Sequence, residues 1–307
     1  MSRLHAVPLS RRSALVLTVA SVAGLMMLAW PLLVRSQDGG QLGPPFVFLA
    51  LLPVVIAVVL SEITEGGLDP RVLAVLGVLT AVNAVLRGLS AGTAGVELVF
   101  FLLILAGRVF GPGFGFVLGC TSLFASALLT GGVGPWLPFQ MLCSAWVGMG
   151  AGLLPRRATG RAEIAMLAAY GVVAAYVFGL LMNLSSWPFV LGIAVPGHTG
   201  ISFVAGDPLG SNLHRFLVFT LITSTGSFDT GRAVTTAVAI AVLGPAVLTT
   251  LRRAARRAVV VGAVTGERDT PLPPAGTAPH VNPPVQREEA AMSTPHSGLR
   301  DEAGSQL

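Results

Sequence analysis

Residues 131–141 read GGVGPWLPFQM and separate two apolar segments that are each long enough to cross a bilayer. The glycines and the proline prevent a regular helix through 131–135. Trp136 is typical of a membrane–water interface, and Gln140 places an amide at the start of the next apolar run. A bent polar segment at the lip of a membrane helix needs protein or water to satisfy its backbone. We therefore expect this stretch to form one wall of a binding site.

The whole chain has the composition of an integral membrane protein. Its 307 residues have a mean hydropathy of +0.78, only 11% of them are charged, and several apolar runs approach the length that a helix needs to span hydrocarbon. We expect an all-α membrane protein with about eight transmembrane helices. The predicted spans are, in chain order, 13–34, 45–60, 71–89, 97–110, 113–129, 137–154, 163–184 and 232–251.

These spans divide the chain into three parts. Residues 1–70 hold the first two spans, and residues 71–257 hold the other six, with a long mixed connection at 185–231. Residues 258–307 are rich in Pro, Thr, Ala and charge and lack apolar periodicity, which predicts a disordered tail.

The basic residues exclude one activity and indicate an orientation. All 19 are arginine, so the chain cannot contain a Walker A loop, which requires lysine. If ATP drives this protein, another chain hydrolyses it. The basic balance is explained by membrane orientation rather than by nucleic-acid binding.

The arginines gather in three places that fall on one side of the membrane if the chain crosses it eight times. The positive-inside rule makes that side cytoplasmic and places both termini there, in the plasma membrane. The connections at 89–96, 129–136 and 185–231 then emerge on the outer face. The clusters are Arg11 and Arg12; Arg156, Arg157 and Arg161; and Arg252, Arg253, Arg256 and Arg257.

Small residues recur at helical spacing in several spans. In the third span they form a stripe that either packs within the chain or docks a partner subunit. In spans four to six, glycines spaced by four indicate close helix packing. The stripe comprises Ala74, Gly77, Ala81, Ala84 and Gly88, and the glycines are Gly107, Gly111, Gly115, Gly119, Gly148 and Gly152.

Two polar residues of the third span share a helix face near its outer end. They are Asn83 and Arg87, which lie four residues apart. Arg87 either reaches the lipid headgroups or faces an outer cavity and pairs with Glu97 at the start of the next span. Arg108, at the inner end of that span, is interpreted as an orientation anchor.

The long connection supplies further polar candidates. Asn212 and Arg215 would share a face of a short helix and can hydrogen-bond a polar ligand. Asp229 is interpreted either as a cap of the eighth span or as a ligand contact. Trp187 and Trp136 are expected to form an interfacial belt.

No catalytic or metal site is predicted. His198 and His214 have no companion cysteine or carboxylate at metal-ligand spacing, and no nucleophile–base order or HExxH pattern occurs. Cys120 and Cys143 lie in apolar runs and are interpreted as packing residues rather than a disulfide or metal pair.

Residues 71 to about 257 resemble the substrate-binding membrane subunit (S component) of energy-coupling factor (ECF) vitamin transporters. The likeness is carried by AVNAVLR at 81–87, the glycines of 107–115, the stretch 131–141, NLHRF at 212–216 and DTGRA at 229–233. It implies a six-helix core with both ends cytoplasmic, a vitamin pocket near the outer face, and a membrane coupling subunit driven by two ATP-binding subunits. It also implies that Ala74, Gly77 and Ala81 contact the coupling subunit. The first two spans and the tail lie outside the likeness.

We therefore expect a substrate-specificity subunit of an ATP-driven importer, with no covalent cofactor. Cobalamin is the first guess for its ligand, and riboflavin, pantothenate and a thiamine precursor stay open. The expected ligand contacts are Asn83, Arg87, Glu97, Trp136, Gln140, Asn212, Arg215 and Asp229.

Three alternatives stay open at this point. A stand-alone secondary transporter needs a titratable residue deep in a span, whereas Glu97 and Glu163 lie at span ends. An intramembrane lipid-modifying enzyme needs a catalytic constellation, which the sequence does not show. A structural membrane scaffold needs neither.

Overall fold

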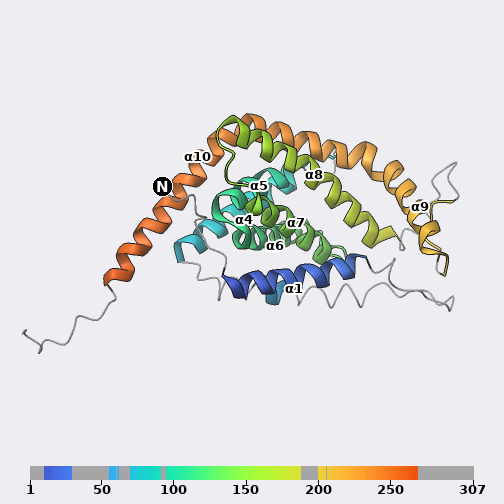
Figure 1. The fold of residues 1–307 in the computed structure, drawn as a ribbon, viewed down its shortest axis with the longest axis horizontal. Coiled ribbons are helices and arrows are strands. Elements are labelled where there is room, and N and C mark those ends of the chain that lie inside the picture. The colour runs from blue at the N-terminus through green and yellow to red at the C-terminus, as the bar shows by residue number, and fades with distance from the viewer. Residues whose placement is uncertain are drawn as a thin grey trace, which may run out of the picture. The chain divides into compact units, whose positions relative to one another are not determined.

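The computed structural model describes residues 10–29, 55–59, 61, 70–90, 95–187, 200–204 and 206–268, and side chains up to residue 257. The described residues are all-helical, with eight α-helices and one π-helix and no strand (Figure 1). The chain divides into two units, 1–266 and 267–307. The helices are α1 Arg11–Leu28, α4 Pro70–Ser90, α5 Val99–Phe110, α6 Pro112–Thr130, α7 Leu137–Leu153, α8 Arg161–Ser186, α9 Leu209–Thr220, the π-helix η2 Leu221–Asp229, and α10 Thr230–Arg268.

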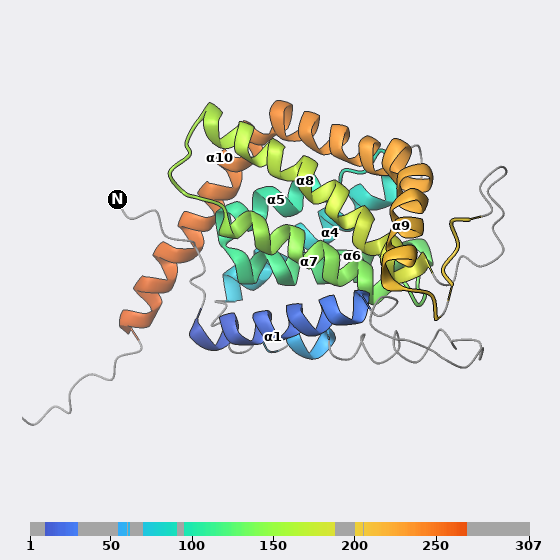
Figure 2. The ribbon, with the colours of Figure 1, turned by 45° about the vertical axis from the view of Figure 1, so that its right-hand side comes forward.

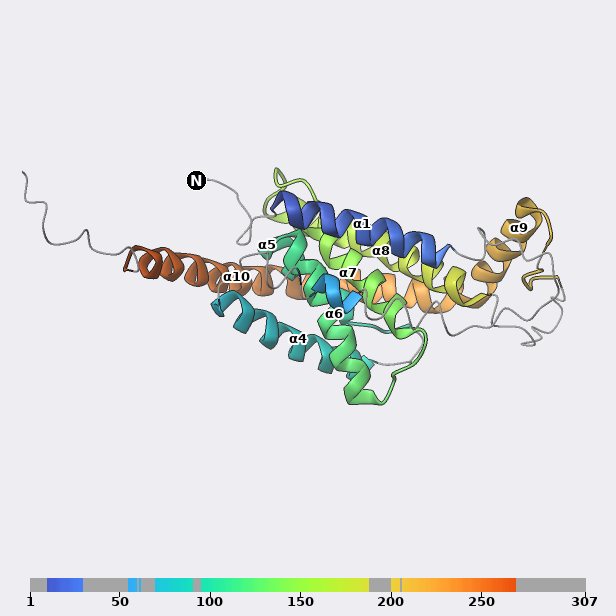
Figure 3. The same cartoon turned by 90° about the horizontal axis from the view of Figure 1, so that it is seen from below.

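Five of these helical segments are long and apolar enough to cross a bilayer. They are α1, α4, α6, α8 and the continuous helix Leu209–Arg257, while α5 is a shorter apolar helix. The protein is therefore a multi-pass membrane protein. Figure 3 shows α4 on one side of the bundle and α1 and α8 on the other, with α5 and α7 between them.

The stretch 131–136 breaks the helix as predicted. Gly131 adopts φ 65°, a left-handed conformation that suits glycine, and its N–H caps α6 by donating to the Ala127 carbonyl. α7 then begins at Leu137, with Pro138 in its first turn where no backbone donor is needed. Between α5 and α6, Gly111 (φ 114°) and Pro112 make the second predicted break.

The predicted glycine pattern is confirmed as close packing of α7 against α5 and α6. A Cβ atom on Gly107 or Gly115 would collide with the backbone carbonyl of Gly148, and one on Gly119 would lie 2.5 Å from the Ala145 Cα atom. Gly152 packs in the same way against the Gly111–Pro112 backbone. Helices in lipid associate through such close backbone contact because no hydrophobic driving force acts between them.

A polar ladder joins α4 to α6. Thr80 Oγ1 lies 2.8 Å from Thr121 Oγ1, and Asn83 Nδ2 donates to Ser122 Oγ at 3.0 Å. These partners advance together along both helices, so α4 and α6 are parallel. Asn83 is fully buried in this interface.

Pairwise contacts fix which end of the bundle each helix enters. Trp146 Nε1 donates to Ser21 Oγ at 2.9 Å, and Gly24 packs against Leu142, so α1 is antiparallel to α7. The start of α1 therefore lies at the same end as the loop between α7 and α8. Arg252 of α10 reaches Glu163 at the start of α8, which brings α10's arginines there too. We call this the arginine end, and it holds all three arginine clusters of the sequence analysis.

The opposite end, which we call the connector end, holds the segments 95–98, 131–136 and 200–204. Figures 1 and 2 show α10 running beside α8 and turning at this end into α9. The described parts of the three connections that the sequence placed on one face of the membrane thus lie at one end of the bundle.

Three charged residues make a buried cluster at the arginine end, which we call the Glu163 cluster. Arg108 Nε donates to Glu163 Oε1 at 2.8 Å, and Arg252 Nη2 donates to the same carboxylate at 2.7 Å. Arg108 also donates to the Leu154 carbonyl at 2.9 Å. The cluster ties α5, α8, α10 and the α7–α8 loop together. Arg108, which the sequence indicated as an orientation anchor, is thus buried and hydrogen-bonded inside the protein.

The described residues correct the predicted course of the chain after α8. The connection predicted at 185–231 is helical from Leu209 onward, and α9, η2 and α10 form one continuous helix. Because the helix continues through Asp229 and its carboxylate accepts from the side chains of Ser224 and Arg232, Asp229 does not cap a helix start. α10 also continues past the predicted tail boundary at 258, to Arg268. Most of the predicted span 45–60 lies outside the described residues. The part of it that is described, 55–59, is helical.

Candidate functional site

A cavity of about 410 Å³ lies at the connector end, between α8, the segment 201–202 and the helix that runs through α9, η2 and α10. Its volume falls within the range of small-molecule sites, roughly 300–1,000 Å³. Its wall combines aromatic rings, hydroxyl and amide groups, and one ion pair. The lining residues are Phe178, Gly179, Met182, Asn183, Ser186, Trp187, Ile201, Ser202, Phe219, Thr223, Ser224, Phe228, Asp229 and Arg232.

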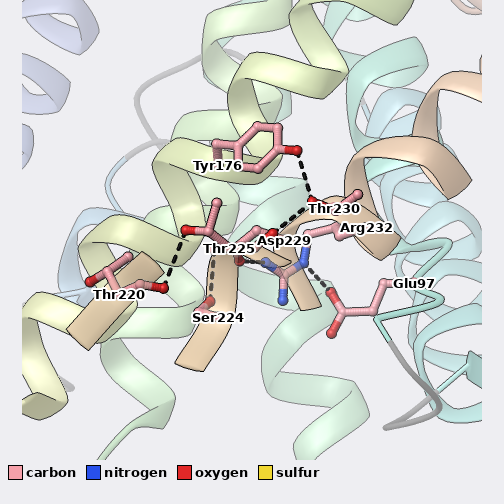
Figure 4. Close-up of polar contacts among 8 residues, drawn as sticks. All are labelled: Glu97, Tyr176, Thr220, Ser224, Thr225, Asp229, Thr230 and Arg232. Atoms are coloured by element: carbon pink, nitrogen blue, oxygen red, sulfur yellow. Dashed lines mark hydrogen bonds and ion pairs between the residues drawn. The ribbon is translucent and has the colours of Figure 1, made fainter. Parts of the chain in front are cut away.

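The charged part of the wall consists of Asp229 and Arg232, which form a cluster with Glu97 behind them; we call this the Arg232 cluster (Figure 4). Arg232 Nη1 donates to Asp229 Oδ1 at 3.1 Å, and Arg232 Nε donates to Glu97 Oε2 at 2.6 Å. Asp229 Oδ2 accepts a further bond from Ser224 Oγ at 2.7 Å. One guanidinium therefore serves two carboxylates, and the Asp229 side chain is only 2% exposed.

Glycine at position 179 makes room for this carboxylate. A Cβ atom there would overlap the carboxylate of Asp229. The absence of a side chain on α8 at this turn thus lets Asp229 reach the cavity wall, which is a close approach that only glycine allows.

Aromatic rings surround the ion pair. The guanidinium of Arg232 lies 4.8 Å from the centroid of Phe178 and 5.6 Å from that of Phe100, within the range of cation–π attraction. Trp187 is 2% exposed and packs edge-on against Phe203, with ring centroids 5.3 Å apart. The expected interfacial belt therefore does not include Trp187, because that side chain is buried inside the protein.

Two side chains hold the segment 201–204 against the helices. Trp187 Nε1 donates to the Ile201 carbonyl at 2.8 Å. Asn212 both accepts from the Val204 N–H at 3.1 Å and donates to the Val204 carbonyl at 2.8 Å. Arg215 in turn donates to Asn212 Oδ1 at 3.1 Å. Asn212 and Arg215 thus fix one wall of the cavity from behind rather than lining it.

The π-helix η2 forms part of the cavity wall. Thr225 Oγ1 donates to the Thr220 carbonyl at 3.2 Å, and Thr230 Oγ1 donates to the Thr225 carbonyl at 2.6 Å, each five residues back (Figure 4). Tyr176 Oη of α8 lies 2.9 Å from Thr230 Oγ1. π-helical turns are rare and recur at functional sites.

The other predicted site residues lie in a separate place. Arg87 donates to Ser126 Oγ and to Gln140 Oε1, both at 3.1 Å, and extends the polar ladder between α4, α6 and α7. Trp136 is 52% exposed and lies before α7. Of the eight predicted contacts, the structure brings Asp229 to the cavity wall and Glu97 behind it, while Asn83, Arg87, Gln140 and Trp136 do not line the cavity.

Several residues that line the cavity were not among the predicted ligand contacts. Arg232 and Asn183 are two of them. The Nδ2 atom of Asn183 is buried and has no hydrogen-bond partner among the described residues. A polar residue near the end of an otherwise apolar helix was the available signal, because α8 ends in NLSS.

These features define a class: a multi-pass helical membrane protein with a solute-sized cavity near one end of its bundle. Over residues 71–264 the chain matches the family described as ECF transporter, substrate-specific component. Neither curated proteins nor solved structures give a match. Because the family match covers more than half of the chain, the protein belongs to the substrate-specific components of ECF transporters. Such a component is a transport subunit that binds substrate and is not an enzyme.

Proposed function

We propose that this protein binds a micronutrient in the 410 Å³ cavity and delivers it across the plasma membrane together with a coupling subunit and two ATP-binding subunits. The observation that carries the proposal is the buried Asp229 carboxylate, which lines a cavity rich in aromatic rings. A cavity near the lower limit of small-molecule sites favours a compact vitamin over cobalamin, the first guess, because a corrinoid is the largest of the four candidates.

The proposed topology places the arginine end in the cytoplasm and the cavity toward the outside. The positive-inside rule supports this orientation, since all three arginine clusters lie at one end. In this proposal α4, α5, α6, α7, α8 and α10 form the six-helix core within 71–257. α1 ends at the connector end and α4 begins at the arginine end, so the chain has to cross the membrane once more between them. In this proposal the span predicted at 45–60 makes that crossing. Both termini are then cytoplasmic.

The proposed docking face for the coupling subunit lies on α4. Ala74, Gly77 and Ala81 are exposed, and a Cβ atom on Gly77 would meet nothing within 4 Å. Asn83 and Leu76 face the bundle on the other side of the same helix. A stripe of small residues turned away from the bundle allows a partner helix to approach closely.

Replacing Ala81 with tryptophan is expected to abolish co-purification of the coupling subunit and the ATPases, because the bulky ring blocks close approach. The measurement is affinity capture of the tagged protein from cells that express all subunits. Ligand binding by the variant alone should stay within about twofold of wild type. Val238→Trp, on the exposed side of α10, is the matched control. Equal capture of the A81W variant and wild type would exclude this face.

Ligand binding itself is tested with the full-length protein in lipid nanodiscs. Calorimetric titration with thiamine, riboflavin, pantothenate and cobalamin should show one tight binder. If none of these solutes binds or co-purifies, the proposed function is wrong.

Gly179→Ala is expected to weaken binding of that ligand at least about tenfold, because the added methyl group displaces the Asp229 carboxylate. The matched control is Gly210→Ala in α9, where a Cβ atom has open space. Wild-type affinity in the G179A variant would show that ligand binds elsewhere.

A further inference from the structure

The charges around the cavity are not paired one to one. Arg232 is hydrogen-bonded to both Asp229 and Glu97, and its guanidinium also lies near two phenyl rings. Within this cluster the two carboxylates share one guanidinium, with the Ser224 hydroxyl added on the side of Asp229. Arg232 is therefore divided between Glu97 and the carboxylate that lines the cavity.

Other cations near the cluster do not satisfy Asp229. Arg87 attracts Glu97, but it belongs to the α4 ladder, donates to Ser126 and Gln140, and does not line the cavity. Arg215 forms its own ion pair with Asp207 at 2.7 Å. Among the described residues that line the cavity, Arg232 is the one cation and Asp229 the one anion.

The apolar part of the cavity also suits a positively charged ligand. Phe178, Trp187, Phe219 and Phe228 contribute aromatic rings beside the carboxylate. Aromatic faces attract organic cations through the ring quadrupole, most strongly where water is excluded. An anion would instead meet a carboxylate whose guanidinium is already engaged twice, and desolvation would strengthen the repulsion.

We propose that the substrate is a compact organic cation, whose positive charge meets the Asp229 carboxylate and whose body packs among the aromatic rings. With such a ligand bound, Asp229 pairs with the ligand and Arg232 stays paired with Glu97. Asn183, whose amide lacks a partner among the described residues, provides an additional hydrogen-bonding group on the same wall. This inference rests on the proposed function, since it specifies the ligand of the same cavity.

Three probes that share the same ring but differ in charge test the proposal. The probes are 1-methylnicotinamide, nicotinamide and nicotinate, which carry positive, zero and negative charge, with thiamine as a larger cation. They are titrated into the full-length protein in nanodiscs by calorimetry. We expect 1-methylnicotinamide to bind at least about tenfold more tightly than nicotinamide, and nicotinate more weakly still.

The Glu97→Gln variant separates a charge effect from a structural one. It releases Arg232 to compensate Asp229 fully, so cation affinity should fall about tenfold while nicotinamide affinity changes less than about twofold. Asp207→Asn removes the same charge outside the cavity lining and should leave the ratio of cation affinity to nicotinamide affinity unchanged. A uniform loss for every probe in E97Q would mean a structural role and overturn the proposal.

The outcomes also distinguish this inference from the proposed function. If neither thiamine nor 1-methylnicotinamide binds, or if nicotinate binds as tightly as the cation, the charge class is wrong. Binding of riboflavin, pantothenate or cobalamin in that case would leave the proposed function intact. If no solute of either panel binds, both fail together.

Discussion

Replacing Glu163 with alanine is expected to lower the free energy of unfolding by about 3–5 kcal/mol, because it leaves a buried arginine without a counter-charge. Arg108 is 6% exposed, and its Nε atom lies 2.8 Å from Glu163 Oε1. Arg252 contributes less to the loss, since its side chain is 44% exposed and solvent can satisfy it. Thermal and denaturant unfolding of the detergent-solubilised protein, followed by tryptophan fluorescence, measures the effect.

Asp207→Ala is the matched control for this prediction. It breaks the ion pair between Asp207 and Arg215, whose side chains are 35% and 26% exposed, respectively. The free energy of unfolding should therefore fall by no more than about 1 kcal/mol. A second variant, Arg108→Leu combined with Glu163→Leu, removes both charges and should recover much of the lost stability. If E163A costs no more than D207A, the Glu163 cluster does not hold α5, α8 and α10 together.

The second large effect is expected at Gly148, where leucine should lower the free energy of unfolding by about 3 kcal/mol or more. A Cβ atom there would overlap the Gly115 carbonyl, and the Gly148 carbonyl itself lies where side chains on Gly107 and Gly115 would point. The colliding atoms are backbone atoms, so no rotamer change relieves the overlap, and α6 and α7 must separate. Unfolding in detergent and the yield of monodisperse protein report the change.

Gly77→Leu provides the control for this substitution. Its Cβ atom meets nothing within 4 Å on the exposed face of α4, and leucine has a higher helix propensity than glycine. Its stability should match or exceed that of wild type. Equal stability of G148L and G77L would show that the α5–α6–α7 contact is less tight than the structure indicates.

The sequence predicted the helices whose apolar runs are bounded by strong breaks. α4 to α8 lie within a few residues of the predicted spans, since Gly111-Pro112 and the stretch 131–136 interrupt otherwise continuous hydrophobicity. In Leu209–Asp229 only a short helix around Asn212 and Arg215 was predicted, because the segment mixes polar and apolar residues and a polar run such as TSTGS resembles a loop. Apolar length alone does not detect a helix that lines a polar cavity.

The candidate site was only partly predictable because helix register decides which polar residues meet. Asn83 and Arg87 have the composition of ligand contacts, but the rotation of α4 turns them toward serines of α6. Arg232 and Glu97 are 135 residues apart, so no local pattern indicates their ion pair. Trp187 has the signature of an interfacial residue, yet its indole N–H is used inside the protein.

The π-helix sets a constraint on chain length rather than on residue type. Each of its turns accommodates one residue more than an α-helical turn, since its hydrogen bonds reach five residues back instead of four. Shortening Leu221–Asp229 would favour α-helical bonding but would change the angle about the helix axis between Phe219 and Asp229, which both line the cavity. We therefore expect this segment to tolerate substitution better than deletion.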